Sequence, residues 1–441
     1  MTNLSIVGIG EMGIYNAQTM ARRNYNLTLF DPLKTPEQIE ASLPGVKFKI
    51  ATDLESAVRD ADIFLHCVPM DKVYDLLTEA LPYCKPDVLV SGATSRKTPE
   101  AIAFDKAAGP RMQMVTMHDL FTPSKTKEPR KEIRAVINHK SAPESYQKAL
   151  EHFGHTSNYI TEFADVEEHD TITGHTQIKV SHTSLSIAGA FASAGTFPWV
   201  EGGYNHGLDV IKFSLAMRAA SLPPHVYRNI QQGSPHGKRI ISEALEAELQ
   251  LDHLVATNQR SEYANRMNFA RKKIFGPEFG MAILSDADVE QFNGKHHRLN
   301  SHASYMGVLY AAAVSGINPF DHFRATTPMH RSLWLAIDYL CNNKELWAES
   351  LSAPFVDKRV ILEDMVFRAE RDSFALAILQ DSPEIYNRKH EAMTAVLQND
   401  RNMEVVGDAI KKSEKVIGIT GERVLQAKES GLFDEKRRRA A

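Results

Sequence analysis

The sequence predicts an α/β domain with a doubly wound parallel sheet, followed by a domain built of helices alone. Short apolar runs alternate with helical patterns as far as residue 165, and almost every later segment has helical spacing. The chain of 441 residues is also too long for one compact core. We therefore expect one domain over residues 1–165 and a second over residues 166–441.

The opening stretch decides the fold of the first domain. A short apolar run leads into Gly8, Gly10 and Gly13, a helical pattern follows, and a second apolar run ends at Asp31. Gly8 permits a tight turn, Gly10 lets the backbone approach a pyrophosphate, and Gly13 lets helix and strand pack closely. The helix start offers unpaired N–H groups to phosphates, and Asp31 can accept both hydroxyls of an adenosine ribose. This stretch predicts a dinucleotide-binding βαβ unit.

The choice between NAD and NADP depends on two residues that follow the second strand. Asp31 repels a 2′-phosphate and favours NAD, whereas Lys34 offsets that repulsion and leaves NADP open. In a doubly wound sheet the ligand lies beyond the carboxyl ends of the strands, so residues there should border it. The expected cofactor-binding residues are Gly8, Gly10, Glu11, Met12, Gly13, Asp31, Lys34, Val68 and Pro69.

The rest of the first domain is expected to continue the alternation of strands and helices. His66 lies inside one predicted strand and is expected to be a packed side chain. Strands are predicted over residues 46–50, 61–68, 87–90, 111–117, 131–138 and 157–161, and helices over residues 53–60, from 99 onward, and 145–153.

His118 directly follows a predicted strand, at the edge of the sheet where ligands bind. An imidazole there suits an acid–base group with a pKa near neutrality. A loop histidine that caps the next turn is the alternative, and position alone favours neither.

The second domain is expected to open with one long helix, residues 166–193, which is central to the domain and to a dimer interface. The helix carries His169, His175 and His182. Because His175 and His182 are seven residues apart, they share a face but lie roughly 10 Å apart, too far for one metal ion. We expect no metal site.

Arg218 lies near the end of a helix predicted over residues 209–218, before Pro223 and Pro224. A guanidinium at this position can bind a carboxylate through two hydrogen bonds. The alternative is a surface arginine that completes the helix end. Further helices are predicted over residues 240–249, 302–315 and 331–340.

Bulk properties exclude several classes of protein. The net charge of −4 gives no reason to expect nucleic acid, and the basic residues 436–439 are expected to be a solvated tail. Three cysteines without a CxxC pair suit a reducing compartment. A strand that begins within three residues leaves no room for a signal peptide, and no apolar run is long enough for a membrane span. We expect a cytoplasmic protein.

The order of several motifs resembles the prephenate dehydrogenase family, and its fungal type most closely. The resemblance covers nearly the whole chain. It implies a Rossmann domain joined to a helical domain that interlocks in a homodimer, and oxidation of prephenate, with loss of CO2, to 4-hydroxyphenylpyruvate on the way to tyrosine. The motifs are the GIGEMG turn and residues 94–97, 118–123, 168–170, 176–177, 182, 218, 227–228, 300–302, 319–322 and 327–328.

The resemblance also implies roles for individual side chains. His118 matches the histidine that hydrogen-bonds the substrate hydroxyl, and Ser95 matches the serine that supports it. Arg218 matches the arginine that holds a substrate carboxylate. His182 resembles a substrate histidine, but it lies one residue further from the preceding His–Asp pair than the family implies, so His175 is the alternative. We expect His118 and Arg218 to face one substrate beside the nicotinamide.

Three other functions remain open from the sequence. The same chemistry could act on arogenate or on 4-amino-4-deoxyprephenate. A different hydroxyacid dehydrogenase would rely on a lysine in the central helix, for which Lys179 is the candidate. A protein that senses NAD(P) would bind the cofactor without turnover.

Overall fold

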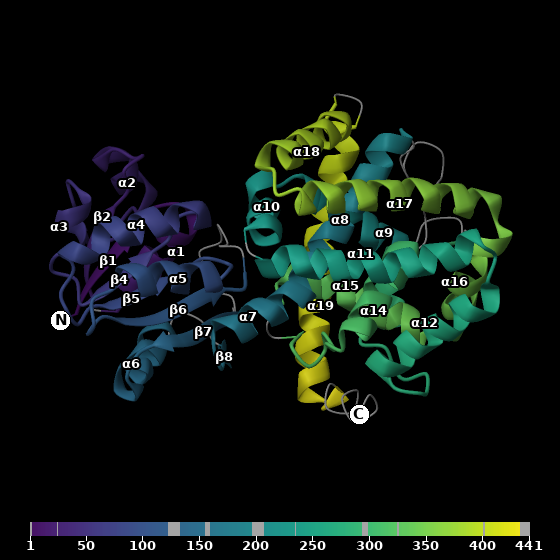
Figure 1. The fold of residues 1–441 in the computed structure, drawn as a ribbon, viewed down its shortest axis with the longest axis horizontal. Coiled ribbons are helices and arrows are strands. Elements are labelled where there is room, and N and C mark those ends of the chain that lie inside the picture. Colours follow the sequence, from purple (N-terminus) through teal and green to yellow (C-terminus); the bar gives the residue numbers. More distant parts are fainter. Residues whose placement is uncertain are drawn as a thin grey trace. The chain divides into compact units, whose positions relative to one another are not determined.

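The computed structural model describes residues 2–23, 25–121, 133–154, 159–195, 207–233, 235–292, 299–323, 326–399 and 402–432 (Figure 1). The chain separates into two compact units, Met1–Ile172 and Thr173–Ala441. The first unit contains the sheet and its helices, and the second is helical. The predicted fold class, an α/β domain followed by a helical one, is therefore confirmed.

Eight strands in the described part of the chain form one sheet, in the order β3-β2-β1-β4-β5-β6-β7-β8. The neighbours from β3 to β6 run parallel, β7 runs antiparallel to β6, and β8 is parallel to β7. The strand order reverses between β1 and β4, where doubly wound sheets bind their ligands. The strands are β1 (Asn3–Val7), β2 (Asn26–Phe30), β3 (Lys49–Ile50), β4 (Ile63–His66), β5 (Leu89–Gly92), β6 (Gln113–Asp119), β7 (Ile133–Lys140) and β8 (Tyr159–Phe163).

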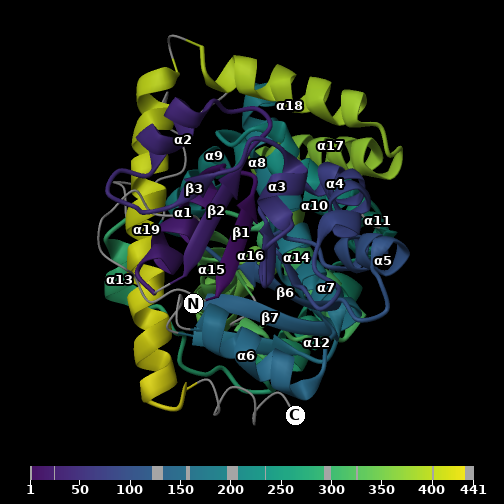
Figure 2. The same cartoon turned by 90° about the vertical axis from the view of Figure 1, so that its left-hand side faces the viewer.

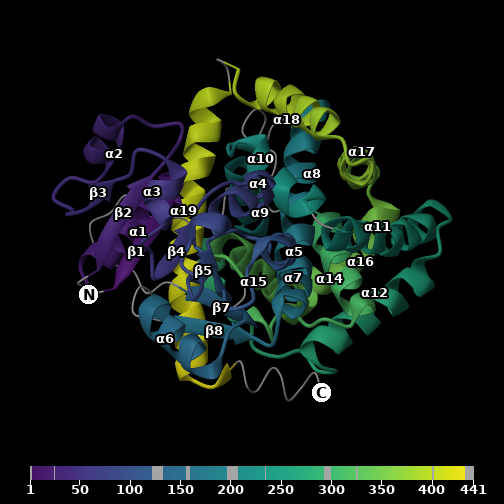
Figure 3. The same cartoon turned by 60° about the vertical axis from the view of Figure 1, so that its left-hand side comes forward.

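Helices cover both faces of this sheet (Figure 2). Side chains alternate along each strand, so that Leu4 and Ile6 of β1 pack with α1 and α6, whereas Val7 packs with α3, α4 and α5. Figure 3 shows α6 beside β7, which it contacts. The helices of this unit are α1 (Glu11–Ala21), α2 (Pro36–Ser42), α3 (Leu54–Val58), α4 (Val73–Ala80), α5 (Thr98–Ala107), α6 (Pro143–Gly154) and α7 (Val166–Thr173), with short turns η1 (Met70–Lys72) and η2 (Leu81–Tyr83).

Several predicted boundaries in the first unit differ from the structure. The strand predicted over residues 46–50 is reduced to β3 at its last two residues, because an edge strand has one neighbour only. The prediction that His118 follows its strand is wrong, since pairing with β7 extends β6 through Asp119. The helix predicted over residues 53–60 is the shorter α3, and Asp53 caps it by accepting the Ser56 N–H at 2.7 Å. Of the strand predicted over residues 157–161, the first two residues lie outside the described residues, and β8 ends two residues later than predicted.

The second unit packs its helices around α8, which is buried along most of its length. α8 contacts α9 and α17, and the long α19 contacts α9 and α15 (Figure 1). No described helix is long and apolar enough to cross a membrane. The helices are α8 (Lys179–Ala194), α9 (Gly207–Ala220), α10 (Pro224–Gln232), α11 (Pro235–Ala256), α12 (Arg260–Phe275), α13 (Asp286–Glu290), α14 (Ala303–Ser315), α15 (Pro328–Asn342), α16 (Lys344–Val356), α17 (Lys358–Leu379), α18 (Pro383–Leu397) and α19 (Met403–Glu429).

The single helix predicted over residues 166–193 is interrupted by a π-helical turn, η3 (Gly174–Ile178). Such a turn takes up one extra residue without ending the helix. The Trp334 indole N–H donates to the Thr176 carbonyl at 3.4 Å. Because the turn lies between His175 and His182, the prediction that a seven-residue spacing puts both on one face is wrong.

Candidate active site

The glycine turn after β1 has the geometry that a dinucleotide pyrophosphate needs. Gly8 has a φ of +90°, and its N–H donates to the Phe30 carbonyl at 2.9 Å. A Cβ on Gly13 would lie 2.0 Å from the Gly8 carbonyl oxygen, so the residue must be glycine for helix and strand to pack. A Cβ on Gly10 would meet no described atom within 4 Å, and no side chain caps α1 at Glu11. These residues fit a bound NAD or NADP.

Asp31 and Lys34 both contact the glycine turn. The two carboxylate oxygens of Asp31 accept the N–H groups of Ile9 at 2.8 Å and Leu33 at 2.9 Å. The Lys34 ammonium donates to the Ile9 carbonyl at 2.5 Å. The Asp31 charge is therefore spread over two backbone amides, and a cation lies directly beside the turn.

Val68 and Pro69 follow β4 next to the same turn. A Cβ on Gly8 would lie 2.9 Å from Val68 Cγ1, so this side chain packs under the turn. Pro69 precedes η1, and Met12 accepts the Asn16 amide N–H at its carbonyl within α1. The predicted cofactor-binding residues thus belong to one region at the carboxyl ends of β1, β2 and β4.

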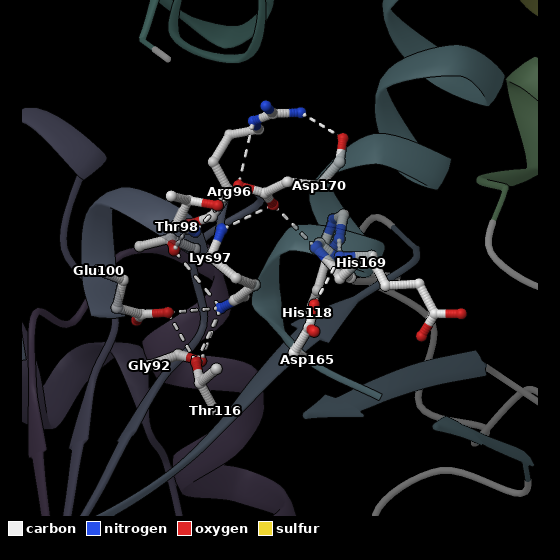
Figure 4. Close-up of polar contacts among 12 residues, drawn as sticks. Gly92, Arg96, Lys97, Thr98, Glu100, Thr116, His118, Asp165, His169 and Asp170 are labelled. Carbon is white, nitrogen blue, oxygen red and sulfur yellow. Dashed lines mark hydrogen bonds and ion pairs between the residues drawn. The ribbon is translucent and has the colours of Figure 1, made fainter. Parts of the chain in front are cut away.

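A chain of three hydrogen-bonded side chains begins at His118 on β6 (Figure 4). Its Nδ1 lies 3.1 Å from Nε2 of His169 on α7, and Nδ1 of His169 lies 2.9 Å from Oδ1 of Asp170. All three residues are buried. Nε2 of His118 has no hydrogen-bond partner among the described residues. We call His118, His169 and Asp170 the histidine chain.

The start of α5 fixes the far end of the histidine chain. The backbone N–H groups of Lys97 and Thr98 donate to the two carboxylate oxygens of Asp170, each at 2.9 Å, and Arg96 Nη1 donates to the Asp170 carbonyl at 3.0 Å. Burial alone would raise the pKa of Asp170, but the hydrogen bond from His169 and the charge of Arg96 hold it well below its ordinary value. Asp170 is therefore an anion held in a fixed position.

The surroundings of His118 keep it neutral. Burial lowers its pKa well below the ordinary value, and positive charge at His169, Lys97 and Arg96 acts in the same direction, while Asp170 opposes it. A neutral imidazole with one unoccupied nitrogen can accept a proton from a bound hydroxyl. His118 has the chemistry of a general base.

A second polar cluster lies beside the histidine chain and has its charges paired internally. The buried Lys97 ammonium lies 2.9 Å from Glu100 Oε2 and 3.0 Å from Thr116 Oγ1, and it donates to the Gly92 carbonyl at 3.2 Å (Figure 4). Glu100 Oε1 lies 2.9 Å from Nε2 of His66. Burial would raise the pKa of Glu100, but Lys97 and His66 lower it to about 2. We call Lys97, Glu100, Thr116, Gly92 and His66 the closed cluster.

Ser95 lies between these two clusters in sequence, in the loop from β5 to α5. Its side chain is exposed, unlike those of Arg96 and Lys97 on its C-terminal side. Its expected support of His118 stays a prediction.

The predicted substrate residues of the second unit lie on two helices. Arg218 near the end of α9 pairs with Glu414 at 3.8 Å. Nε2 of His182 on α8 lies 3.0 Å from the Arg371 carbonyl, and burial lowers the pKa of His182 to about 4. His175 lies in the π turn, where burial lowers its pKa to about 3. Their binding of substrate stays a prediction.

The sequence motifs contained His169 and Asp170 but gave neither a role. Both belong to the motif at residues 168–170, yet His169 lies 51 residues from His118 along the chain. A His–Asp pair at the start of a helix is the only signal in the sequence, and it does not identify the base that the pair serves.

Two family models match the chain, and both are named after 6-phosphogluconate dehydrogenase. The NAD binding domain of that enzyme matches residues 3–117, which cover the glycine turn and the strands up to β6. A 6-phosphogluconate dehydrogenase C-terminal domain matches residues 179–417, more than half of the chain. The chain belongs to the family of this C-terminal domain.

Curated relatives extend the similarity over most of the chain. Prephenate dehydrogenase [NADP(+)] of Saccharomyces cerevisiae is 24% identical over 406 residues, covering 88% of each chain. Probable prephenate dehydrogenase [NADP(+)] of Schizosaccharomyces pombe is 24% identical over 343 residues, covering 76% of this chain and 79% of the relative. The predicted resemblance to the fungal type is confirmed.

Solved structures with a similar fold include two from bacteria. Prephenate dehydrogenase of Aquifex aeolicus, in complex with hydroxyphenyl propionate and NAD+, has a TM-score of 0.45 at 17% identity, covering 60% of this chain and 94% of that one. Arogenate dehydrogenase of Synechocystis has a TM-score of 0.43 at 15% identity, covering 59% and 95%.

Proposed function

We propose that this protein is an NADP-dependent prephenate dehydrogenase in tyrosine biosynthesis. The observation that carries the proposal is His118, a neutral and buried imidazole with one unoccupied nitrogen, in strand β6 of a dinucleotide-binding sheet. The names of the two fungal relatives support the choice of substrate. A base beside a nicotinamide site is what oxidation of a hydroxyl requires.

The proposed reaction follows from this base. A bound nicotinamide supplies the hydride acceptor for the carbon that bears the substrate hydroxyl. His118 Nε2 takes the hydroxyl proton as that hydride leaves. The bond to the ring carboxylate then breaks, CO2 departs, and the electron pair of that bond completes an aromatic ring. The protein has to position the hydroxyl and accept one proton.

Prephenate carries two carboxylates, and we propose Arg218 as the anchor for one of them. Its partner Glu414 is 70% exposed and 3.8 Å away, so the pair is weak and a substrate carboxylate can replace it. A bidentate contact to a carboxylate would be stronger than this pair. Ser95 is proposed to support the substrate hydroxyl from the β5–α5 loop.

Between the two candidate substrate histidines we propose His182. The family implies a spacing one residue shorter than the sequence has, and the π turn at Gly174–Ile178 takes up one extra residue. Residues after the turn therefore keep the helical register that the shorter spacing would give. His175 lies within the turn and has no such correspondence.

We propose NADP rather than NAD as the preferred cofactor. Two backbone N–H groups already hold the Asp31 carboxylate, and this reduces its repulsion of a 2′-phosphate. The Lys34 ammonium beside Ile9 can pair with such a phosphate. Both fungal relatives carry NADP(+) in their names.

We also propose a cytoplasmic homodimer formed through the helical unit. Helix α17 exposes three large apolar side chains, Leu362, Met365 and Leu376, which a second copy could cover. No disulfide joins the three cysteines, as is usual in a reducing compartment. Sedimentation of the purified protein at several concentrations would measure the oligomeric state.

The deciding experiment follows the absorbance of reduced cofactor when the purified protein is given prephenate with NADP or with NAD. Reduction that depends on prephenate, with 4-hydroxyphenylpyruvate and CO2 as products, supports the proposal. Turnover of arogenate or of 4-amino-4-deoxyprephenate but not of prephenate would replace it with a sister activity. Cofactor binding without turnover of any of the three would favour a sensing protein.

A further inference from the structure

The heavy-atom contacts of the histidine chain decide where its hydrogens lie. Asp170 is an anion whose oxygens accept two backbone N–H groups, so it can only accept from His169. Nδ1 of His169 therefore carries a hydrogen. Burial lowers the pKa of His169, so the ring is neutral and has one N–H only. Its Nε2 must then be an acceptor.

The same reasoning fixes the tautomer of His118. Its Nδ1 lies 3.1 Å from the acceptor Nε2 of His169, so Nδ1 of His118 must be the donor. A neutral His118 then has no hydrogen on Nε2. The reverse order would turn a lone pair of His169 toward the carboxylate of Asp170 at 2.9 Å, which is repulsive.

We propose that His169 and Asp170 are positioning residues that hold His118 in the tautomer whose Nε2 accepts the substrate proton. This inference rests on the proposed function for its role in turnover, but the tautomer itself belongs to the resting protein. His118 in the other tautomer would present an N–H to the substrate hydroxyl and could not accept its proton.

The histidine chain has a second effect once the proton has moved. The proton from the substrate adds to Nε2, and His118 becomes a cation that donates from Nδ1 to His169. The fixed charge of Asp170 favours this cation, while Arg96 and Lys97 oppose it. Asp170 stays ionised, because its pKa lies far below neutrality. One proton is transferred, and it ends on His118.

The start of α5 gives the arrangement its rigidity. Two successive N–H groups at the start of this ten-residue helix hold the carboxylate of Asp170, and helix N-termini favour negative charge. The side chain of Lys97 is itself held in the closed cluster. The β5–α5 loop thus orients a base to which it makes no direct hydrogen bond.

Two substitutions of one residue test the inference through turnover. In His169→Gln the amide reaches about as far as Nε2 did, so its oxygen can still accept from His118. In His169→Asn the amide is too short to reach. We expect kcat to fall roughly 100-fold in His169→Asn and about tenfold in His169→Gln. Equal losses in the two variants, or unchanged kcat in both, would overturn the inference.

The pH profile gives a readout that a structural role would not move. The acid limb of kcat/KM reports protonation of His118, and Asp170 is the one group beside it that raises its pKa, against His169, Lys97 and Arg96. In Asp170→Asn this limb should shift to lower pH and kcat should fall. In serine proteases the comparable change lowers kcat about 10⁴-fold through the wrong tautomer. An acid limb at the wild-type pH would contradict the proposal.

NMR of isotope-labelled histidine side chains tests the tautomer without substrate. The resting protein should show His118 with its hydrogen on Nδ1, and His169→Asn should show a mixture of tautomers. The His118 signal is identified by its loss in His118→Asn. His139→Gln is the matched control, since it breaks a partly exposed contact to Asp105 at 3.1 Å in the same unit and should leave His118 unchanged.

The NMR result separates this inference from the proposed function. A His118 hydrogen on Nε2 in the wild-type protein would overturn the inference even if prephenate is turned over. A hydrogen on Nδ1 in a protein that does not oxidise prephenate would uphold the tautomer and reject the substrate.

Discussion

The histidine chain and the closed cluster are neighbours with similar composition and different consequences. Both are buried, both contain a carboxylate and a histidine, and both use Lys97, one through its backbone N–H and the other through its ammonium. In the closed cluster the two opposite charges pair with each other. The histidine chain instead ends at an unoccupied nitrogen of His118. Burial and charge alone therefore do not identify a catalytic group, whereas an unoccupied end does.

The largest effect should come from the open end. His118→Asn removes the proton acceptor, so we expect kcat to fall by about 10² to 10⁴-fold, while the free energy of unfolding changes by no more than about 1 kcal/mol. Steady-state kinetics and urea unfolding of the same preparation measure both quantities. A variant with the wild-type kcat would end the distinction between the two clusters.

Breaking the closed cluster should chiefly affect stability. Glu100→Leu leaves the buried Lys97 ammonium without its counter-charge and should lower the free energy of unfolding by about 3–5 kcal/mol. The double variant Lys97→Met with Glu100→Leu replaces the pair by apolar groups and should regain much of that loss. If the double variant is no more stable than the single one, the cluster does not act as an ion pair.

The closed cluster should also give a defined acid dependence of stability. The pKa of Glu100 falls from its ordinary 4.5 to about 2 on folding. A lowered pKa stabilises the folded state above pH 4.5, and this contribution is lost as the pH falls toward 2. The advantage of the wild type over Glu100→Gln, roughly 3 kcal/mol at neutral pH, should therefore shrink across this window. A constant difference measured by thermal unfolding would contradict the pairing.

Arg218 extends the comparison to a cation that is paired with an exposed carboxylate. Arg218→Ala should raise the KM for prephenate by about 10 to 100-fold with a smaller change in kcat, because a carboxylate anchor is lost. Arg388→Ala, which breaks an exposed pair with Glu384 at 2.7 Å in the same unit, is the control and should leave KM unaltered. An unaltered KM in Arg218→Ala would remove Arg218 from the substrate site.

The smallest expected effect concerns Lys34, an ammonium that contacts a backbone carbonyl. Lys34→Ala should lower the preference for NADP over NAD by roughly tenfold, since a charged hydrogen bond to the 2′-phosphate is lost. The ratio of the two kcat/KM values measures this preference. Lys85→Ala removes a lysine paired with Asp62 before β5 and should not change the ratio. An unchanged ratio in Lys34→Ala would favour a cofactor choice made elsewhere.

Local patterns were sufficient to predict the order of strands and helices. The glycine turn, the alternation up to residue 165 and the helical spacing beyond it all depend on near neighbours in the sequence. They also indicated His118, because residues at the end of a parallel strand lie near the ligand.

Features that depend on distant partners were not predictable in the same way. The pairing of His118 with Ala135 on the antiparallel β7 extends β6 beyond its predicted end. The contact between His118 and His169 joins residues 51 positions apart, and no spacing rule reports it. The π turn also escaped prediction, since its residues have the same helical pattern as those around them.

The π turn has a consequence for comparing this chain with its relatives. One residue of an α-helix corresponds to about 100° of rotation, so an alignment without a gap across Gly174–Ile178 matches residues that point in different directions. A single gap placed inside the turn restores equivalence on both sides. Insertions inside a buried helix are usually treated as alignment errors, but here the backbone itself has room for one.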